Sequence, residues 1–247
     1  MIHKTAIVSE KAKIGNDVKI GAFTTIYDNV IIEDNTEVGP YCELGVESTF
    51  SEGLPLHIGH DSLIRSHSIF YEGSSIGNRL RTGHRVIVRE LSIIGEHFHL
   101  GTLSDIQGHC RIGNYVRTHS NVHIGQNTVI GNYVWIFPYT VFTNDPHPPS
   151  ATQRGVIVED YAVIATMCVI LPGVKIGRCS LVGAHSLVKR DVDPKTIVVG
   201  SPAKPVGPTS KIKLLDNTEK SAYPWTKHYH KGYSQNDIYR WINENND

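Results

Sequence analysis

A large nonpolar residue, usually aliphatic, recurs at every sixth position through most of this chain. The period runs through residues 2–44, 58–142 and 158–188, and only Thr82 and Thr118 are polar at the repeating position. An α-helix requires apolar residues at three- and four-residue spacing, and an amphipathic strand requires strict alternation, so neither explains a period of six. A repeat of this length predicts a parallel β-helix, in which each hexapeptide forms a short strand and a turn.

The predicted fold is therefore all-β, with the nonpolar side chains pointing into a narrow core. Three hexapeptides complete one triangular coil, so residues 18 apart in the sequence stack on one another. Glycine often follows the nonpolar position, as at Gly15, Gly95 and Gly177, because a Cβ atom would crowd the backbone of the turn there. We expect one solenoid domain over residues 1–207 and a short arm over residues 208–247.

Composition excludes several classes of partner. Twenty-four basic and twenty-four acidic residues cancel, so nothing favours nucleic acid or an anionic membrane. Four scattered cysteines without CxxC spacing predict reduced thiols in a cytoplasmic protein. The repeat begins at once after Met1, which leaves no room for a secretory leader, and no apolar run reaches the about 20 residues that span a membrane. We expect a soluble cytoplasmic protein.

Two interruptions of the repeat predict long loops, near residues 46–56 and 143–156. Solenoids push insertions outward onto one face, which is often the binding face. The second loop is dense in polar groups and holds Pro146, Pro148 and Pro149. It is the first place to expect chemistry.

The C-terminal arm lacks the six-residue period and is rich in tyrosine and tryptophan. Ser234 can cap a short helix that carries Ile238, Trp241 and Ile242 on one side. We favour a packing arm that covers the open end of the solenoid. The alternative is that its aromatic rings stack against a nucleotide base in the active-site cleft.

Three segments carry a family resemblance. Residues 142–148 read FTNDPHP, residues 170–177 read ILPGVKIG, and residues 198–204 read VVGSPAK. With the repeat, they resemble the hexapeptide-repeat acyltransferases, and the first is similar to the FTND-x-x-P segment of bacterial N-acyltransferases that acylate nucleotide-linked aminodeoxysugars. The resemblance implies a left-handed β-helix, a homotrimer with sites between subunits, and acetyl-CoA or another acyl-CoA as co-substrate, with no metal required.

The resemblance places Asn144 opposite the acceptor amine, with Asp145 beside it as a substrate-binding candidate. Counting back 18 residues from Asn144 reaches Gln126, where the family often has a carboxylate. This departure weakens the case for a carboxylate base. A sugar amine that is already deprotonated needs only orientation, which two amides can supply.

A hydroxyl acceptor would instead require a base, which makes O-acetylation of a sugar or glycan the alternative function. Galactoside and xenobiotic acetyltransferases of this superfamily use a histidine in or near an equivalent loop, and His147 is the matching residue here; an ordinary loop histidine is an equal alternative. His119 and His123 fall in the coil of Gln126, with Asn121 between them. They are expected to line the same cleft, where His123 can act as base through a water.

The resemblance places the coenzyme on the C-terminal coils. Ala165, Gly183 and Ser201 are spaced by 18, and a column of small residues would let the pantetheine arm lie close to the backbone. Further cofactor-binding candidates are the neighbours of that column and the cations that can bind phosphate, namely Ala184, Pro202, Lys189, Arg190 and Lys204.

Two other classes of protein are alternatives to an acyltransferase. A γ-class carbonic anhydrase shares the fold and binds zinc through three histidines. The histidines that suggest this comparison here are His97, His99, His119 and His123. However, no two histidines here are 18 apart, so no vertical histidine column forms. A non-enzymatic scaffold would not need the polar loop at 143–150 or the closing segment.

Overall fold

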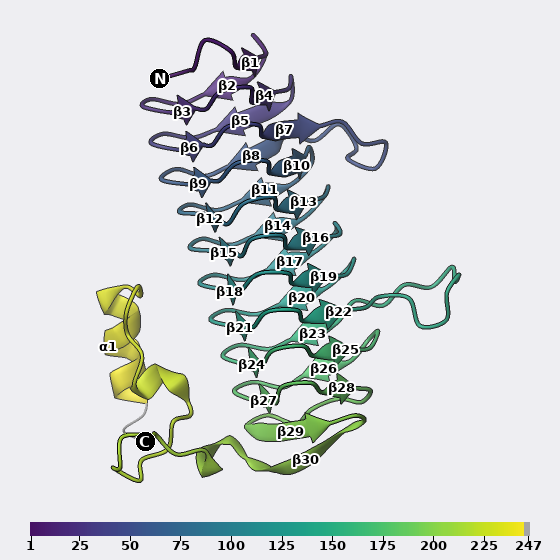
Figure 1. The fold of residues 1–247 in the computed structure, drawn as a ribbon, viewed down its shortest axis with the longest axis vertical. Coiled ribbons are helices and arrows are strands. Elements are labelled where there is room, and N and C mark those ends of the chain that lie inside the picture. The colour runs from purple at the N-terminus through teal and green to yellow at the C-terminus, as the bar shows by residue number, and fades with distance from the viewer. Residues whose placement is uncertain (245–247) are drawn as a thin grey trace.

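The computed structural model describes residues 1–244 and confirms an all-β solenoid of three parallel sheets (Figure 1). Successive strands alternate among the sheets, so every third strand lies in the same one. The first sheet consists of β1 (Ile7–Val8), β4 (Thr25–Ile26), β7 (Glu43–Val46), β10 (Ile69–Tyr71), β13 (Ile87–Val88), β16 (Asp105–Ile106), β19 (His123–Ile124), β22 (Val141–Phe142), β25 (Val169–Ile170) and β28 (Leu187–Val188).

The other two sheets complete the triangle. The second consists of β2 (Lys13–Ile14), β5 (Val30–Ile32), β8 (Leu56–Ile58), β11 (Ser75–Ile76), β14 (Ile93–Ile94), β17 (Arg111–Ile112), β20 (Val129–Ile130), β23 (Ile157–Val158) and β26 (Lys175–Ile176). The third consists of β3 (Lys19–Ile20), β6 (Glu37–Val38), β9 (Leu63–Ile64), β12 (Arg81–Thr82), β15 (His99–Leu100), β18 (Arg117–Thr118), β21 (Trp135–Ile136), β24 (Val163–Ile164), β27 (Leu181–Val182), β29 (Thr196–Gly200) and β30 (Ala203–Pro208).

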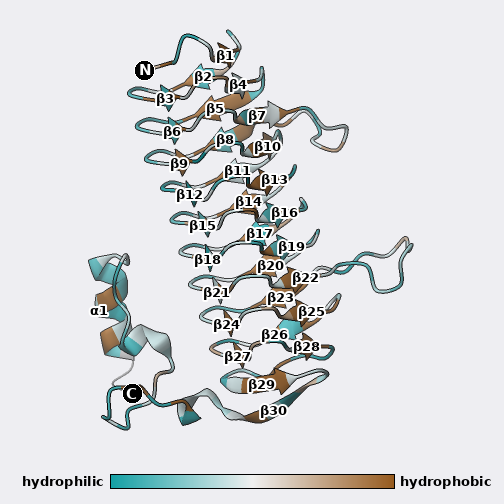
Figure 2. Ribbon diagram, viewed as in Figure 1, coloured by the Kyte–Doolittle hydropathy of each residue, from teal (hydrophilic) through white to brown (hydrophobic). Residues whose placement is uncertain are grey.

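The period of six explains the core. In most strands the second residue points inward and is buried, while the first points outward. Figure 2 shows hydrophobic colour mainly on the strands and hydrophilic colour on most turns. The two polar exceptions are buried and hydrogen-bonded, since the hydroxyls of Thr82 and Thr118 accept from the backbone N–H groups of Arg65 and Gly101. These bonds offset the cost of burying a hydroxyl.

Three rows of turns form the edges of the triangle. We call the turns that leave the first sheet the first edge, those that leave the second sheet the second edge, and those that leave the third sheet the third edge. Both long loops, between β7 and β8 and between β22 and β23, leave from the first edge and project on the same side of the solenoid (Figure 1). The chain therefore concentrates its insertions along one line.

The arm does not lie where we expected it. β29 and β30 form an antiparallel hairpin that ends the stack, and the arm (residues 209–244) turns back along the flank instead of covering the end (Figure 1). It contains η1 (Thr209–Lys211), η2 (Trp225–Lys227) and α1 (Gln235–Glu244). No helix in the described residues is long and apolar enough to cross a membrane.

Aromatic packing holds the arm against the third sheet and the second edge. Tyr115, Tyr133 and Tyr161 stack in a column on that edge, with ring centroids 5.2 and 5.1 Å apart. Trp241 of α1 packs edge-on against Tyr133 and is 2% exposed. The helix begins as predicted, because the N–H of Asp237 donates to the hydroxyl of Ser234. Its other predicted apolar residues are less buried, and Ile242 is 53% exposed.

Candidate functional site

A pocket of about 430 Å³ opens on the first edge, between the two long loops. Three of the residues singled out in the sequence, His123, Gln126 and Asn144, line it together. The others come from both loops and from turns of earlier coils, namely Phe50, Arg89, Glu90, Gln107 and Gln153. The pocket thus lies beside the second loop, where we expected chemistry from the sequence.

A glycine lies in the column of turn residues beside this pocket. Glu90, Gly108, Gln126 and Asn144 occupy equivalent positions on successive coils, and Gly108 alone in this column has no side chain. Its φ of +93° is a left-handed value that favours glycine, and a Cβ there would lie 2.9 Å from the carbonyl oxygen of Glu90. The gap at Gly108 separates the acidic end of the pocket from its two amides.

His123 is held by a carboxylate that the sequence reading missed. Asp105 precedes it by 18 residues, and the Nδ1 of His123 lies 2.9 and 3.1 Å from the two carboxylate oxygens. A carboxylate can only accept, so Nδ1 must carry the proton, and the lone pair of the neutral ring lies on Nε2. The 18-residue register that relates Gln126 to Asn144 also relates Asp105 to His123, so the sequence contains the signal for this pair.

The interaction between Asp105 and His123 shifts the pKa of each group in the direction that favours its charged form. The hydrogen bond to Asp105 raises the pKa of His123, and this outweighs the opposing effect of burial. Burial alone would raise the pKa of Asp105, but hydrogen bonds from His123 and Gln107 outweigh it, so the pKa is lowered. His123 is therefore a stronger base than an isolated imidazole.

A second charged pair closes the far end of the pocket. Glu90 is 2% exposed and accepts two hydrogen bonds from Arg89, at 2.9 and 3.1 Å. The guanidinium of Arg89 also lies 5.3 Å from the ring centre of Tyr71. Bidentate pairing and stacking hold this arginine in one orientation. The sequence alone did not identify this Arg89–Glu90 pair, although Glu90 lies three coils before Asn144 in the same column of equivalent positions.

The remaining loop candidates have other surroundings. Asp145 accepts hydrogen bonds from the Ser150 hydroxyl, at 2.6 Å, and from the backbone N–H of His147, at 3.1 Å. The bond from Ser150 lowers the pKa of Asp145. Asp145 therefore shapes the loop itself. The side chain of His147 is exposed and does not line the pocket.

His119 and Asn121 do not join His123. They lie on the third edge, where the His119 ring stacks on Phe137 at 4.6 Å. Burial and the nearby Arg117 lower the pKa of His119. Within one chain, β19 separates the third edge from the first edge, so a cleft lined by both histidines would have to form between subunits and stays a prediction.

The proposed coenzyme column holds only in part. Ala165 and Gly183 follow β24 and β27 in register, but β27 pairs with β29 so that Val182 is opposite Val198. The last coil is therefore two residues short, and Val199 rather than Ser201 follows Gly183; a Cβ on Gly183 would lie 2.5 Å from Val199. The other cofactor candidates are exposed, namely Ala184, Lys189, Arg190, Ser201, Pro202 and Lys204.

Sequence comparison finds the hexapeptide repeat and a set of similar enzymes. The family model "Bacterial transferase hexapeptide (six repeats)" matches residues 11–45. The bifunctional protein GlmU of Carboxydothermus hydrogenoformans is 27% identical over 208 residues, which cover 79% of this chain and 42% of that protein. These matches support the resemblance of the chain to the hexapeptide-repeat acyltransferases.

The chain also has partial likenesses to several other enzymes. A 2,3,4,5-tetrahydropyridine-2,6-dicarboxylate N-acetyltransferase of Staphylococcus aureus is 34% identical over 96 residues, 39% of this chain and 34% of that protein. The Arabidopsis UDP-N-acetylglucosamine acyltransferase shares the fold, with 19% identity, a TM-score of 0.56, and coverage of 84% of this chain and 74% of that one. The chain spans less than half the length of these curated sequence relatives.

The four histidines that suggested the zinc enzyme lie apart in the structure. His97 stacks on Tyr115 at the second edge, His99 lies on the third sheet, and His119 and His123 lie as described. Within residues 1–244, no three histidine, cysteine, aspartate or glutamate side chains are grouped as metal ligands would be.

Proposed function

We propose that this chain transfers an acyl group, typically acetyl, from acyl-CoA to the amino group of a nucleotide-linked aminodeoxysugar in the cytoplasm, for surface glycan biosynthesis. One observation carries the proposal: His123, oriented by Asp105 at 2.9 Å, lines the same pocket as Gln126 and Asn144. The pocket thus combines a base with two amides that can orient an acceptor. The FTND segment at this pocket supports an amine.

Acyl transfer to an amine requires a base and groups that hold the acceptor or the oxyanion. The Nε2 atom of His123 accepts the proton that the amine loses as its nitrogen attacks the thioester carbonyl. The new C–N bond replaces the C–S bond, and the departing sulfur takes up a proton. Amide N–H groups of Gln126 and Asn144 are available to hold the acceptor or the developing oxyanion.

The same pair favours one second candidate, transfer to a hydroxyl. A hydroxyl is not nucleophilic at neutral pH without a base, and His123 with Asp105 supplies one. The two candidates differ in what they need. Removing the base should abolish transfer to a hydroxyl at all pH values, whereas an amine should regain reactivity as the pH approaches its own pKa.

We further propose that the protein assembles as a homotrimer through the first and second sheets. The arm already covers the C-terminal part of the outer face of the third sheet, including Val163, Leu181 and Ile197. On the second sheet, by contrast, Ile93 and Ile157 point outward and are 52% and 41% exposed. Burying such aliphatic side chains against another copy is favourable.

The decisive experiment measures acyl transfer from acetyl-CoA to a panel of dTDP-, UDP- and GDP-linked aminosugars and to the matching sugars that carry a hydroxyl in place of the amine. Acetylation of an aminosugar by the wild type, lost in His123→Gln and retained in His147→Gln, is the expected result. Turnover of hydroxy sugars alone would replace the first candidate by the second. Turnover of neither, with intact fold by circular dichroism, would reject both.

A further inference from the structure

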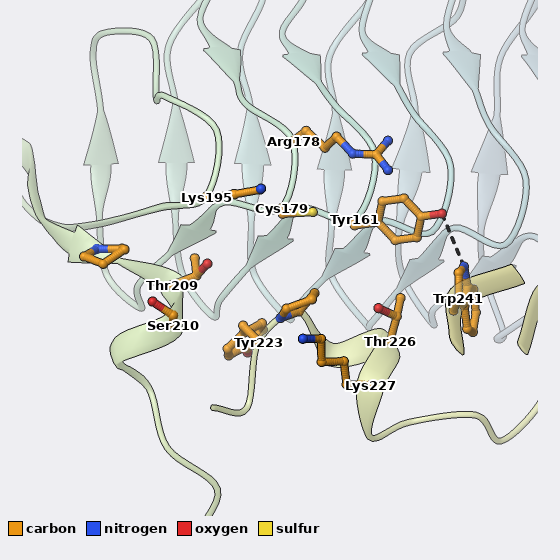
Figure 3. A pocket seen from close by; sticks show the side chains of 12 residues that line it. Tyr161, Arg178, Cys179, Lys195, Thr209, Ser210, Tyr223, Thr226, Lys227 and Trp241 are labelled. Atoms are coloured by element: carbon orange, nitrogen blue, oxygen red, sulfur yellow. Dashed lines mark hydrogen bonds between the residues drawn. The ribbon is translucent and has the colours of Figure 1, made fainter. Parts of the chain in front are cut away.

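A second pocket, of about 410 Å³, lies on a different edge of the triangle from the His123 pocket. It occupies the second edge, between turns of the last coils and the arm (Figure 3). Arg178, Cys179 and Lys195 lie on the solenoid wall, and Thr209, Ser210, Tyr223 and Lys227 lie on the arm wall. The docking of the arm therefore creates this pocket.

The charges around the pocket are all of one sign. Its lining includes Arg178, Lys195 and Lys227 and no aspartate or glutamate, although the whole chain has a net charge of zero. Arg178 pairs with Asp160 at 3.2 Å, which offsets much of its charge. Neither lysine makes an ion pair with any residue of the described chain. Two uncompensated ammonium groups thus face one cavity.

Hydroxyl groups and aromatic rings complete the lining. Thr209 and Thr226 are each 5% exposed, and Ser210 adds a third hydroxyl. Three aromatic rings line the wall; Tyr161 and Trp241 are nearly buried, so Tyr223 presents the most accessible ring. Ammonium and hydroxyl groups are donors that suit phosphate oxygens, and aromatic faces suit a flat heterocycle.

The arm fixes one of the lysines in place. The N–H of Lys195 donates to the carbonyl of Arg178 at 2.8 Å, and the carbonyl of Lys195 accepts from the N–H of Thr209 at 2.8 Å. The Lys195 backbone is therefore held from both walls. Lys227 reaches the cavity from η2, so a ligand that bound both lysines would bridge the arm and the solenoid.

We propose that this pocket binds a nucleoside phosphate, with its phosphates between Lys195 and Lys227 and its base against the aromatic wall. The volume lies within the range of small-molecule sites. The site lies on another edge and shares no residue with the His123 pocket; as a site for CoA or a sugar nucleotide it rests on the proposed function, and as a site for a free nucleotide it goes beyond it. The ligand is either part of a substrate, such as the nucleotide of CoA or of a sugar nucleotide, or a free nucleotide.

Calorimetric titration of the full chain with ADP, UDP and inorganic pyrophosphate tests the proposal without any acyl transfer. We expect binding of at least one nucleotide, weakened about tenfold by Lys195→Gln and by Lys227→Gln, the scale of one charge-assisted hydrogen bond. Lys231→Gln is the matched control, since this exposed arm lysine does not line the pocket, and it should bind as the wild type does. Nucleotide binding should also protect the arm from limited proteolysis.

Competition separates the sources of the ligand. If CoA displaces ADP and both lysine variants have a raised KM for acetyl-CoA, the ligand is the coenzyme. If a UDP-sugar displaces UDP, the ligand is the sugar nucleotide. If neither displacement occurs, the ligand is a free nucleotide. Absence of nucleotide binding at millimolar concentration, or equal binding by both lysine variants and the wild type, would overturn the proposal. Because binding is read directly, inactivity of the His123 pocket would leave this result intact.

Discussion

Asp105 and His123 stand at equivalent positions on successive coils of the first sheet, and the carboxylate of one holds the imidazole of the other at 2.9 Å. The fold itself sets this distance, because parallel strands in register place outward side chains directly above one another. Two short strands, β16 and β19, are sufficient to make the pair. Loop conformation plays no part in it.

Replacing Asp105 by Asn should shift the pH dependence of kcat/KM. The carboxylate raises the pKa of His123, and a base must be neutral to act, so the rate falls as the pH drops through that pKa. Without the charge, the acid limb should move to lower pH and the maximum rate should fall. A pH–rate profile that keeps its acid limb in place would show that His123 is not the titrating base.

Removing the base should cost more than removing the loop histidine. We expect His123→Ala to lower kcat/KM by roughly 10²- to 10⁴-fold, the usual contribution of general-base catalysis. His147→Ala, which removes an exposed side chain outside the pocket, should stay close to wild type. Steady-state kinetics on both proteins checks this, and the opposite order would move the chemistry to the tip of the loop.

Asn144→Ala should affect turnover without affecting stability. Within residues 1–244 the side-chain amide of Asn144 donates only to Gln153, at 3.0 Å, in a partly exposed position, so the change in unfolding free energy should stay within about 0.5 kcal/mol. Gln153→Ala removes the partner and serves as control. Parallel losses of activity and melting temperature in Asn144→Ala would mean that this residue is structural.

The arm should contribute strongly to stability through one residue. Trp241 is 2% exposed among aromatic rings, and Trp241→Ala should cost about 3–5 kcal/mol. Tyr239, on the same helix, is 72% exposed, and Tyr239→Ala should change stability by less than about 0.5 kcal/mol. Urea unfolding measures both, and similar values for the two would argue that the arm is not firmly docked.

Stability should fall on mild acidification because of His99. Burial, with Arg117 and Arg81 beside it, lowers the pKa of this histidine to about 4. Between about pH 6.5 and 4 the unfolded chain therefore binds a proton that the folded chain does not, so the unfolding free energy decreases as the pH falls. His99→Gln should flatten this slope in urea titrations at pH 7 and 4.5, and His109→Gln, an exposed histidine, is the control. An unchanged slope in His99→Gln would contradict the assignment.

The repeat made the fold predictable, while the arm and the end of the solenoid were not. A period of six sustained over most of the chain leaves one architecture, and the 18-residue register correctly brought Gln126 beside Asn144. The same register failed at Ser201, because the last coil is two residues short and no period marks its end. The arm follows aromatic contacts between residues far apart in sequence, such as Trp241 with Tyr161, which no local pattern encodes.

The docked arm also changes how the solenoid unfolds. Each coil otherwise touches only its neighbours, so a solenoid frays from its ends. Side chains of the arm form hydrogen bonds with Tyr133 and Trp135 on one coil and with Tyr161 on the next, which ties these two coils into one cooperative unit. At the other end, the core residues Val8 and Ile14 are only partly buried. Opening therefore begins at the N-terminal coils, and amide hydrogen exchange should be fastest there and slowest beneath α1.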